Sequence, residues 1–289
     1  MQQLTDEKKI ELETFANEIR KSIIEMLVEA GSGHTAGPLG MTDIFTALYF
    51  HILKHDPDKP DWPERDRLIL SNGHICPVLY ATMAYAGYFP KKELLTLRKF
   101  GSRLQGHPHR EFLPALETSS GPLGSGLSQA VGMAIADRID NGRSSGKYFY
   151  CLTGDGELNE GQNWEAVQLA GKENLHNLIM IVDRNNIQID GYTEDVMPLD
   201  SLYDKFVAHN WHVQEVDGHN FDDIVAAVGK AQAVFENPSV IIARTIPGKG
   251  VEEFERKPEW HGKPPSKEEA KDALKELRSL GGKISGDHD

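Results

Sequence analysis

The chain has 289 residues, of which 39% are hydrophobic and 26% charged, an ordinary balance for a globular protein. Its formal net charge of −13, without a basic patch, argues against a nucleic-acid-binding protein. The N-terminus lacks the basic and apolar regions of a signal peptide, and no apolar run is long enough to span a membrane. Only two cysteines, Cys76 and Cys151, are present, so a disulfide framework is not expected. These features predict a soluble cytoplasmic protein without a nucleic-acid or membrane partner.

The first third of the chain combines helical patterns with one short strand. Residues 5–30 carry apolar side chains near the helical period, with Thr5 as a possible N-cap and Gly31 after the last turn. The run Arg67–Leu70 is expected to be a buried strand that leads into Ser71-Asn72-Gly73-His74. Further helices are expected over 42–53, 77–87 and 90–100, with a Pro- and Asp-rich loop over 55–64.

The segment 101–126 is rich in Gly, Pro and Ser and shows little periodicity. A loop of that length inside a compact domain is usually functional or disordered. After it, helices and strands alternate: helices are expected over 128–141, 160–173 and 221–235, and strands over 148–152, 178–182, 211–216 and 240–245. This alternation predicts an α/β fold, with a mostly parallel sheet covered by helices on both faces.

The C-terminal part contains one more helical pattern, over 266–280, which is rich in Lys and Glu. We interpret it as a solvated amphipathic helix rather than a docking element. Residues 1–280 are expected to form a single domain, and residues 281–289 a flexible tail.

Two neighbouring strands of the expected sheet end in polar motifs. Gly154-Asp155-Gly156 follows the first strand, and Asn185-Asn186 follows the second. Ligands of open α/β sheets bind at the carboxyl edge of the strands, where these motifs would meet. Asp and Asn oxygens suit Mg²⁺, which keeps phosphate oxygens in its coordination shell, and the glycines allow backbone amides to approach a phosphate. The sequence therefore predicts a site for a metal and a diphosphate at this edge.

Among the twelve histidines, the candidates for function are four that adjoin glycine at expected loops or element ends: His34, His74, His107 and His261. A lone histidine is more often a surface or core residue than a ligand. That interpretation applies to His51, His55, His176, His209, His212 and His288. His219, which follows a strand in Asp217-Gly218-His219-Asn220, is expected to be a turn or capping residue.

A series of short motifs occurs along nearly the whole chain. In order, they are Ser32-Gly33-His34, Ser71-Asn72-Gly73-His74, Gly106-His107-Pro108, Gly121-Pro122-Leu123-Gly124, Gly154-Asp155-Gly156 with Glu160-Gly161, Asn185-Asn186-Ile187 with Ile189-Asp190-Gly191, and Trp260-His261-Gly262. In its order and spacing, this series resembles the diphosphate-binding half of transketolase, a thiamine diphosphate enzyme. The resemblance implies the thiamine diphosphate-binding fold.

The resemblance also implies how the cofactor would be held. Mg²⁺, or another divalent cation such as Ca²⁺ or Mn²⁺, would be bound by the Asp155 and Asn185 side chains and the Ile187 carbonyl. His74 and the Gly156 amide would contact the diphosphate. The remaining contacts with the cofactor would come from Gly121, Pro122 and Leu123 at the aminopyrimidine, Ile189 at the centre of the cofactor and His261 near the diphosphate.

The resemblance implies the reaction as well. A ketose is cleaved between its second and third carbons, and a two-carbon ketol unit passes to an aldose, with the cofactor storing electrons. His34 and His107 would face the donor sugar, and His261 the reacting carbon, where imidazoles could move protons near neutral pH. Glu160 matches a family carboxylate at the subunit interface.

The chain departs from the commoner family pattern in two short motifs and in length. Thr35 and Ala36 follow His34 where proline and glycine are usual, and Ile75-Cys76-Pro77 follows His74. Single-chain transketolases continue into a pyrimidine-binding domain, which supplies the activating glutamate and most of the residues that bind a sugar phosphate. We therefore expect an N-terminal subunit that is active only with a separate C-terminal subunit, as a heterotetramer with two copies of each.

Other functions stay open at this point. Another thiamine diphosphate enzyme, similar to 1-deoxyxylulose-5-phosphate synthase or to the α subunit of 2-oxo acid dehydrogenases, shares part of the pattern. A non-catalytic partner protein that keeps the fold is an alternative from a different class. The sequence leaves the donor and acceptor sugars open, and with them the choice between the pentose phosphate pathway and a dedicated catabolic route.

Overall fold

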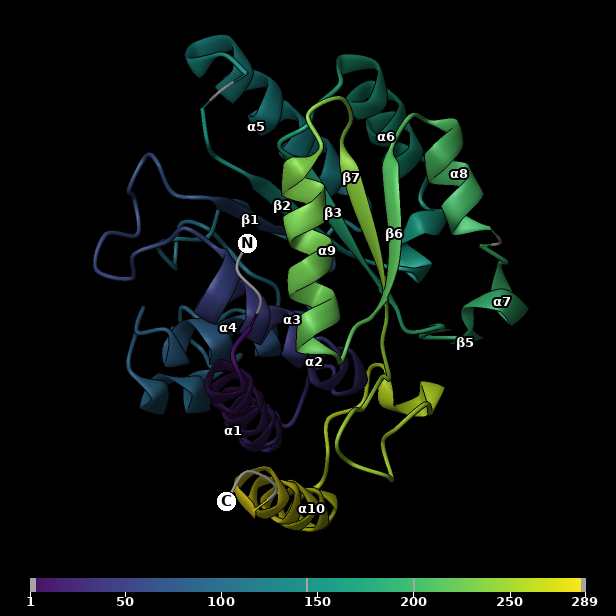
Figure 1. Cartoon of the computed structure of the whole chain (residues 1–289). Coiled ribbons are helices and arrows are strands. Elements are labelled where there is room, and N and C mark those ends of the chain that lie inside the picture. Colours follow the sequence, from purple (N-terminus) through teal and green to yellow (C-terminus); the bar gives the residue numbers. More distant parts are fainter. Residues whose placement is uncertain (1–3, 144, 200, 287–289) are drawn as a thin grey trace.

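The structure, a computed structural model, describes residues 4–143, 145–199 and 201–286. Five strands form one sheet in the order β1-β2-β3-β7-β6 (Figure 1). Every neighbouring pair in it is parallel, which confirms the predicted α/β fold. The strands are β1 (Arg67–Leu70), β2 (Phe149–Gly154), β3 (Leu178–Arg184), β6 (His212–Asp217) and β7 (Ser239–Arg244). A separate antiparallel hairpin was not predicted and consists of β4 (Ile187–Gln188) and β5 (Gly191–Tyr192).

Both faces of the strands β2, β3 and β7 are buried, as their apolar sequences require, whereas the edge strand β6 is partly exposed. Alternate side chains along each strand enter two different hydrophobic clusters, for example Leu152 in one and Cys151 in the other. The first cluster is closed by α1 (Asp6–Ala30), α3 (Thr42–Ala47), α4 (Cys76–Tyr85) and α9 (Phe221–Ala233). The second is closed by α5 (Ser125–Asn141), α6 (Gly161–Glu173) and α8 (Leu202–Ala208). In Figure 1, α9 lies in front of the sheet, and α5 and α6 lie behind it.

The two terminal helices pack against each other. The Thr5 side chain accepts a hydrogen bond from the Lys8 amide at 3.2 Å and caps α1, and Gly31 ends it with φ 63°, as expected. The final helix, α10 (Lys267–Gly286), lies beside α1 (Figure 1) and buries Ala270, Ala273 and Leu277. It is therefore amphipathic, with one face packed. It also continues beyond residue 280, where a flexible tail was predicted; residues 287–289 of that tail lie outside the described residues.

The largest differences from the prediction lie before the long loop. The helix expected over 42–53 is α3 followed by a π-helical turn, Leu48–Ile52, and the helix expected over 90–100 is only a 3₁₀ turn, Lys91–Thr96. Leu97 adopts an extended conformation with ψ 129° and is buried, so the chain turns inward instead of continuing a helix. The short helices α2 (Ala36–Gly40) and α7 (Thr193–Val196) were not predicted; further 3₁₀ turns are Gly73–Ile75, Gly156–Asn159 and Pro258–Trp260.

The parallel strands bring their carboxyl ends to one edge of the sheet. Ser71 follows β1, Asp155 follows β2, Asn185 follows β3 and Thr245 follows β7. Segments far apart in the sequence therefore meet at this edge, where open α/β sheets bind their ligands. Among the described residues, no helix is both long and apolar enough to cross a membrane.

Candidate active site

A cavity of about 370 Å³ opens at the carboxyl edge of the sheet. It brings together most of the residues predicted from the sequence, which come from the ends of β1, β2 and β3 and from four loops. The predicted residues that line it are His34, His74, His107, Gly121, Leu123, Asp155, Gly156, Asn185, Ile187, Ile189 and His261. Pro122 and Glu160 are exposed and do not line this cavity.

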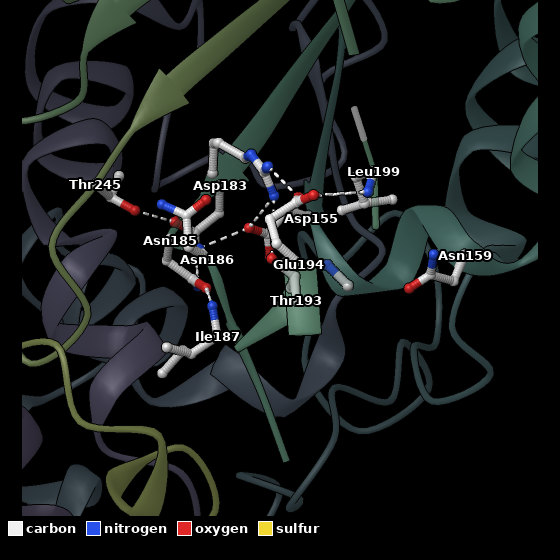
Figure 2. A network of polar contacts seen from close by, with 12 residues as sticks. Asp155, Asn159, Asp183, Asn185, Asn186, Ile187, Thr193, Glu194, Leu199 and Thr245 are labelled. Atoms are coloured by element: carbon white, nitrogen blue, oxygen red, sulfur yellow. Dashed lines mark hydrogen bonds and ion pairs between the residues drawn. The ribbon is translucent and has the colours of Figure 1, made fainter. Parts of the chain in front are cut away.

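The Asp155 carboxylate is held in one orientation by the backbone around it. One oxygen accepts the Gly156 amide at 2.8 Å, and the other accepts the Asn186 amide at 2.7 Å (Figure 2). Asn186 lies in the left-handed region, with φ 63°, a conformation that Asn tolerates well. Asp155 is 1% exposed, and burial raises the pKa of its carboxyl to about 6. A buried carboxylate of this kind is stabilised by a cation.

Asn185 is oriented by a second carboxylate. Its side-chain oxygen accepts the Ile187 amide at 2.9 Å, and its nitrogen donates to Asp183 at 2.8 Å (Figure 2). The Thr245 hydroxyl donates to the other oxygen of Asp183, and burial raises the pKa of Asp183 to about 7. The amide oxygen of Asn185 therefore lies on the side away from Asp183. Asp183 was not predicted from the sequence, although its position at the end of β3 was a usable signal.

Arg184 was not predicted as a site residue either. Its guanidinium lies 3.2 Å from an Asp155 oxygen and donates to Thr193 at 3.1 Å and to Glu194 at 2.5 Å. It therefore connects the end of β3 to α7, just after the hairpin that carries Ile187. The positive charge beside Asp155 offsets part of the cost of burying that carboxylate.

Three imidazoles that line the cavity lie close together. The ring centroids of His34, His74 and His261 lie 4.9 to 5.6 Å apart. Burial, assisted by the other histidines, lowers the pKa of His34 to about 4 and that of His74 well below its usual value, and burial also lowers the pKa of His261. These rings are therefore neutral near pH 7, each with one nitrogen that donates and one that accepts. His107 is more exposed, and burial followed by the charge of Arg98 lowers its pKa.

Several buried polar atoms of this site have no hydrogen-bond partner in the described part of the chain. They are Nδ1 of His34, Nδ1 of His261, and both polar atoms of the Asn72 amide, a residue that is 1% exposed. An unsatisfied buried polar group costs about 1–3 kcal/mol, so such groups mark a place where a polar ligand fits. Asn72 was not predicted as a site residue, although it stands in the Ser-Asn-Gly-His motif.

Another part of the cavity lining is apolar and more open. Leu123 and Ile189 line it with side chains that are 39% and 69% exposed. Gly124 closes the loop with φ 86°, in the left-handed region that favours glycine. The cavity thus has a polar side at Asp155 and an apolar side at Leu123, which suits a ligand with a charged group and a ring.

The donor set limits which cation could bind. Within the part of the chain that the structure describes, no group of three His, Cys, Asp or Glu side chains is arranged to hold a metal. Asp155 and Asn185 supply only two side-chain oxygens, so a hard cation would need further oxygens from a backbone carbonyl and from the ligand itself. Mg²⁺ bound to a diphosphate meets that requirement.

The other histidines lie elsewhere. His219 accepts the Ile246 amide at Nε2 and donates from Nδ1 to Asp43, each at 2.7 Å, so it anchors the chain after β7. The histidines interpreted as structural do not line the cavity: His51, His55, His176, His209 and His212. His288 lies outside the described residues.

Comparison with known proteins identifies the family. The family profile described as "Transketolase, thiamine diphosphate binding domain" matches residues 12–281. The 6-deoxy-6-sulfo-D-fructose transketolase subunit SqwG of Clostridium sp. (strain MSTE9) is 44% identical over 275 residues, which cover 95% of this chain and 99% of that protein. A subunit of the apulose-4-phosphate transketolase of Phocaeicola vulgatus is 38% identical, with 92% of this chain and 93% of that protein covered.

A solved structure has the same fold and shows how much of a longer transketolase this chain matches. Transketolase from Campylobacter jejuni superposes with a TM-score of 0.87 at 36% identity, and the match covers 93% of this chain but only 43% of that longer chain. The chain is therefore similar in full length to proteins named as subunits and in part to a longer transketolase. It belongs to the transketolase family and corresponds to the thiamine diphosphate-binding domain of that family.

Proposed function

We propose that this chain holds thiamine diphosphate and a divalent cation and, together with a C-terminal subunit, transfers a two-carbon ketol unit from a ketose to an aldose. The observation that carries the proposal is one cavity that is lined both by Asp155 and Asn185 and by three neutral imidazoles. When bound, the cofactor would supply the electron sink that ketose cleavage needs.

The residues present fit the cofactor at both ends. Asp155, Asn185 and the Ile187 carbonyl would hold the cation, and the Gly156 amide with His74 would hold the diphosphate. On the apolar side, the aminopyrimidine would lie against loop 121–123 and the centre of the cofactor against Ile189. Pro122 would act here only as part of the loop, because its ring does not line the cavity.

The histidines would transfer protons to and from the sugar. His34 and His261 each keep an unpaired buried Nδ1, and His107 is exposed at the same cavity. We assign His34 and His107 to the donor hydroxyls and His261 to the reacting carbon. A neutral imidazole can accept a proton from a hydroxyl and return it later, which is the requirement for general acid–base catalysis.

The open side of the cavity supports a partner subunit. Leu123, Ile189 and nearby Tyr192 are large apolar side chains that remain 39%, 69% and 48% exposed. We propose that the C-terminal subunit covers them in a heterotetramer with two copies of each subunit, and that Glu160, exposed just before α6, lies at a subunit interface. A cytoplasmic location belongs to the same proposal, and the two buried free cysteines suit a reducing compartment.

The substrates are ketose and aldose phosphates or related sugars with an acidic tail. The relatives are named for 6-deoxy-6-sulfo-D-fructose and apulose 4-phosphate, so these two donors are the first to test beside xylulose 5-phosphate. Specificity for the tail would be set mainly by the C-terminal subunit, because the described cavity residues of this chain belong to the cofactor end.

The test combines this chain with the product of the neighbouring reading frame, Mg²⁺ and thiamine diphosphate. Ketol transfer to ribose 5-phosphate is expected only with both subunits, and omission of the cation is expected to abolish it. Full turnover by this chain alone would refute the requirement for a partner. Failure of the two-subunit mixture to bind Mg²⁺ and thiamine diphosphate would favour a non-catalytic role instead.

A further inference from the structure

Glu157 is a buried carboxylate in the turn after β2 whose role the proposed function leaves open. It is 3% exposed and lines the cavity. One carboxylate oxygen accepts the Ser71 hydroxyl at 2.5 Å and the Gly124 amide at 2.6 Å, and the other accepts the Gly154 amide at 3.1 Å. Glu157 therefore joins three segments: the one after β1, the one before α5, and the one after β2.

The contacts around Glu157 hold these segments from both sides. The Ser71 oxygen accepts the Gly126 amide at 3.1 Å, and a Cβ on Gly126 would lie 2.4 Å from the Cβ of Ser71, so the backbone of α5 approaches as closely as glycine allows. The Asn163 side chain donates to the Glu157 carbonyl at 2.7 Å and fixes the turn to α6. Neither the side chain nor the backbone of Glu157 is free to move independently.

Both carboxylate oxygens of Glu157 face hydrogen-bond donors, so this position requires an acceptor at each of them. The Gly124 and Gly126 amides belong to the N-terminal end of α5, where backbone N–H groups lack intrahelical partners and the helix dipole is positive. A glutamine would accept at one atom only, and its NH₂ group would face either Gly154 N–H or the Ser71 and Gly124 donors.

We propose that Glu157 is a positioning residue that holds loop 121–124 in a fixed place relative to the Gly154-Asp155-Gly156 turn. Glu157 thereby sets the separation between the apolar wall of the cavity and its metal and diphosphate end before a ligand arrives. Such preorganisation lowers the ordering cost of binding a ligand that contacts both ends. The identity of that ligand rests on the proposed function, whereas the connection between the two segments is a property of this chain alone.

The first measurement needs no ligand. Amide hydrogen exchange of the full chain is measured for the wild type and for the variants Glu157→Gln, Ser71→Ala and Glu268→Gln. Glu268 is an exposed carboxylate on α10, so its substitution controls for the change in charge. We expect exchange over residues 121–126 to become about tenfold faster in Glu157→Gln, and less so in Ser71→Ala, which keeps the Gly124 and Gly154 bonds. Unchanged exchange over 121–126 in a folded Glu157→Gln protein would overturn the proposal.

The second measurement separates positioning from a general loss of structure. With Mg²⁺ and the C-terminal subunit present, the affinities for thiamine diphosphate and for inorganic pyrophosphate are compared. Glu157→Gln should weaken thiamine diphosphate binding about tenfold and pyrophosphate binding by less than about threefold, because only the former reaches loop 121–124. Equal losses for both ligands would refute a positioning role. If the Gln variant does not fold, Ser71→Ala is judged by the same two measurements.

The two proposals fail in different ways. A wild-type complex that binds neither ligand would contradict the proposed function, while the exchange measurement would still decide whether Glu157 holds loop 121–124. A wild-type complex that binds both ligands, with a Gln variant indistinguishable from it, would contradict the role of Glu157 and leave the proposed function intact.

Discussion

The polar and apolar sides of the cavity are built differently. On the polar side, Asp155, Asp183 and Asn185 are at least nine-tenths buried. Each of these side chains is held by hydrogen bonds to residues that lie near strand ends. On the apolar side, Leu123 and Ile189 sit on a loop and a hairpin and stay well exposed. This contrast supports the proposal that this chain forms the metal and diphosphate end of the site, whereas the C-terminal subunit covers the apolar side.

The strongest test of the polar side is Asp155→Asn. The substitution keeps the shape but removes the charge that a cation needs, so we expect cation-dependent binding of thiamine diphosphate to fall by at least about 100-fold, and activity of the two-subunit complex to be lost. Isothermal titration with Mg²⁺ and the cofactor measures the effect. Asp195→Asn, exposed on α7, is the matched control, and an equal loss there would contradict the assignment.

The histidine cluster is tested by His34→Gln. Because we propose that His34 faces the donor sugar and not the cation, we expect kcat of the two-subunit enzyme to fall about 100-fold, with cofactor affinity changed less than about threefold. Steady-state kinetics and cofactor titration give the two values. A large loss of cofactor affinity with kcat unchanged would place His34 at the cofactor instead.

Asp183→Asn tests whether the carboxylate behind Asn185 acts through orientation. The substitution leaves two amide groups face to face, so we expect the Asn185 oxygen to lose its fixed direction and Mg²⁺ affinity to fall about tenfold. Thr245→Val removes the donor on the far side of Asp183 and should cause a smaller loss. Titration of Mg²⁺ at saturating cofactor measures both, and an unchanged affinity in Asp183→Asn would show that Asn185 needs no such support.

The apolar side is tested by Ile189→Ala. Since the side chain is 69% exposed, we expect the free energy of unfolding of this chain alone to stay within the roughly ±0.5 kcal/mol usual for surface substitutions. Activity of the two-subunit enzyme should fall several-fold, because Ile189 then contacts the cofactor and the partner. If stability of the isolated chain fell strongly, the apolar side would be an integral part of the core rather than an open surface.

The smallest expected effect is a change in the pH dependence of the free energy of unfolding. Burial holds the pKa of His34 at about 4, below the usual 6.5, so between these values the unfolded chain binds a proton that the folded chain does not. The His34 contribution to the free energy of unfolding is therefore present above pH 6.5 and declines as the pH falls toward 4. Melting curves in EDTA from about pH 7.5 to 5 should show a shallower acid decline for His34→Gln than for the wild type. If the wild type and His34→Gln lost stability in parallel as the pH fell, this result would contradict a buried, neutral His34 in the folded chain.

The regular elements were largely predictable because their signals are local. The apolar runs before Gly154-Asp155-Gly156 and Asn185-Asn186 became β2 and β3, and Thr5 caps α1 as expected. The prediction was wrong where burial overrode helical periodicity. Leu97 turns inward in an extended conformation, so the expected helix over 90–100 is only a short 3₁₀ turn.

The sequence by itself determined the family and the chemical types of the site, because a carboxylate, an amide and histidines beside glycines can be recognised at strand ends and loops. Only the tertiary structure decided which buried residues orient these side chains of the site. Asp183, Arg184 and Glu157 meet their partners through strand pairing, turns and loop packing, and their roles follow from contacts at 2.5 to 3.2 Å, most of them between segments distant in the chain. Such contacts depend on register and burial, which only the folded chain defines.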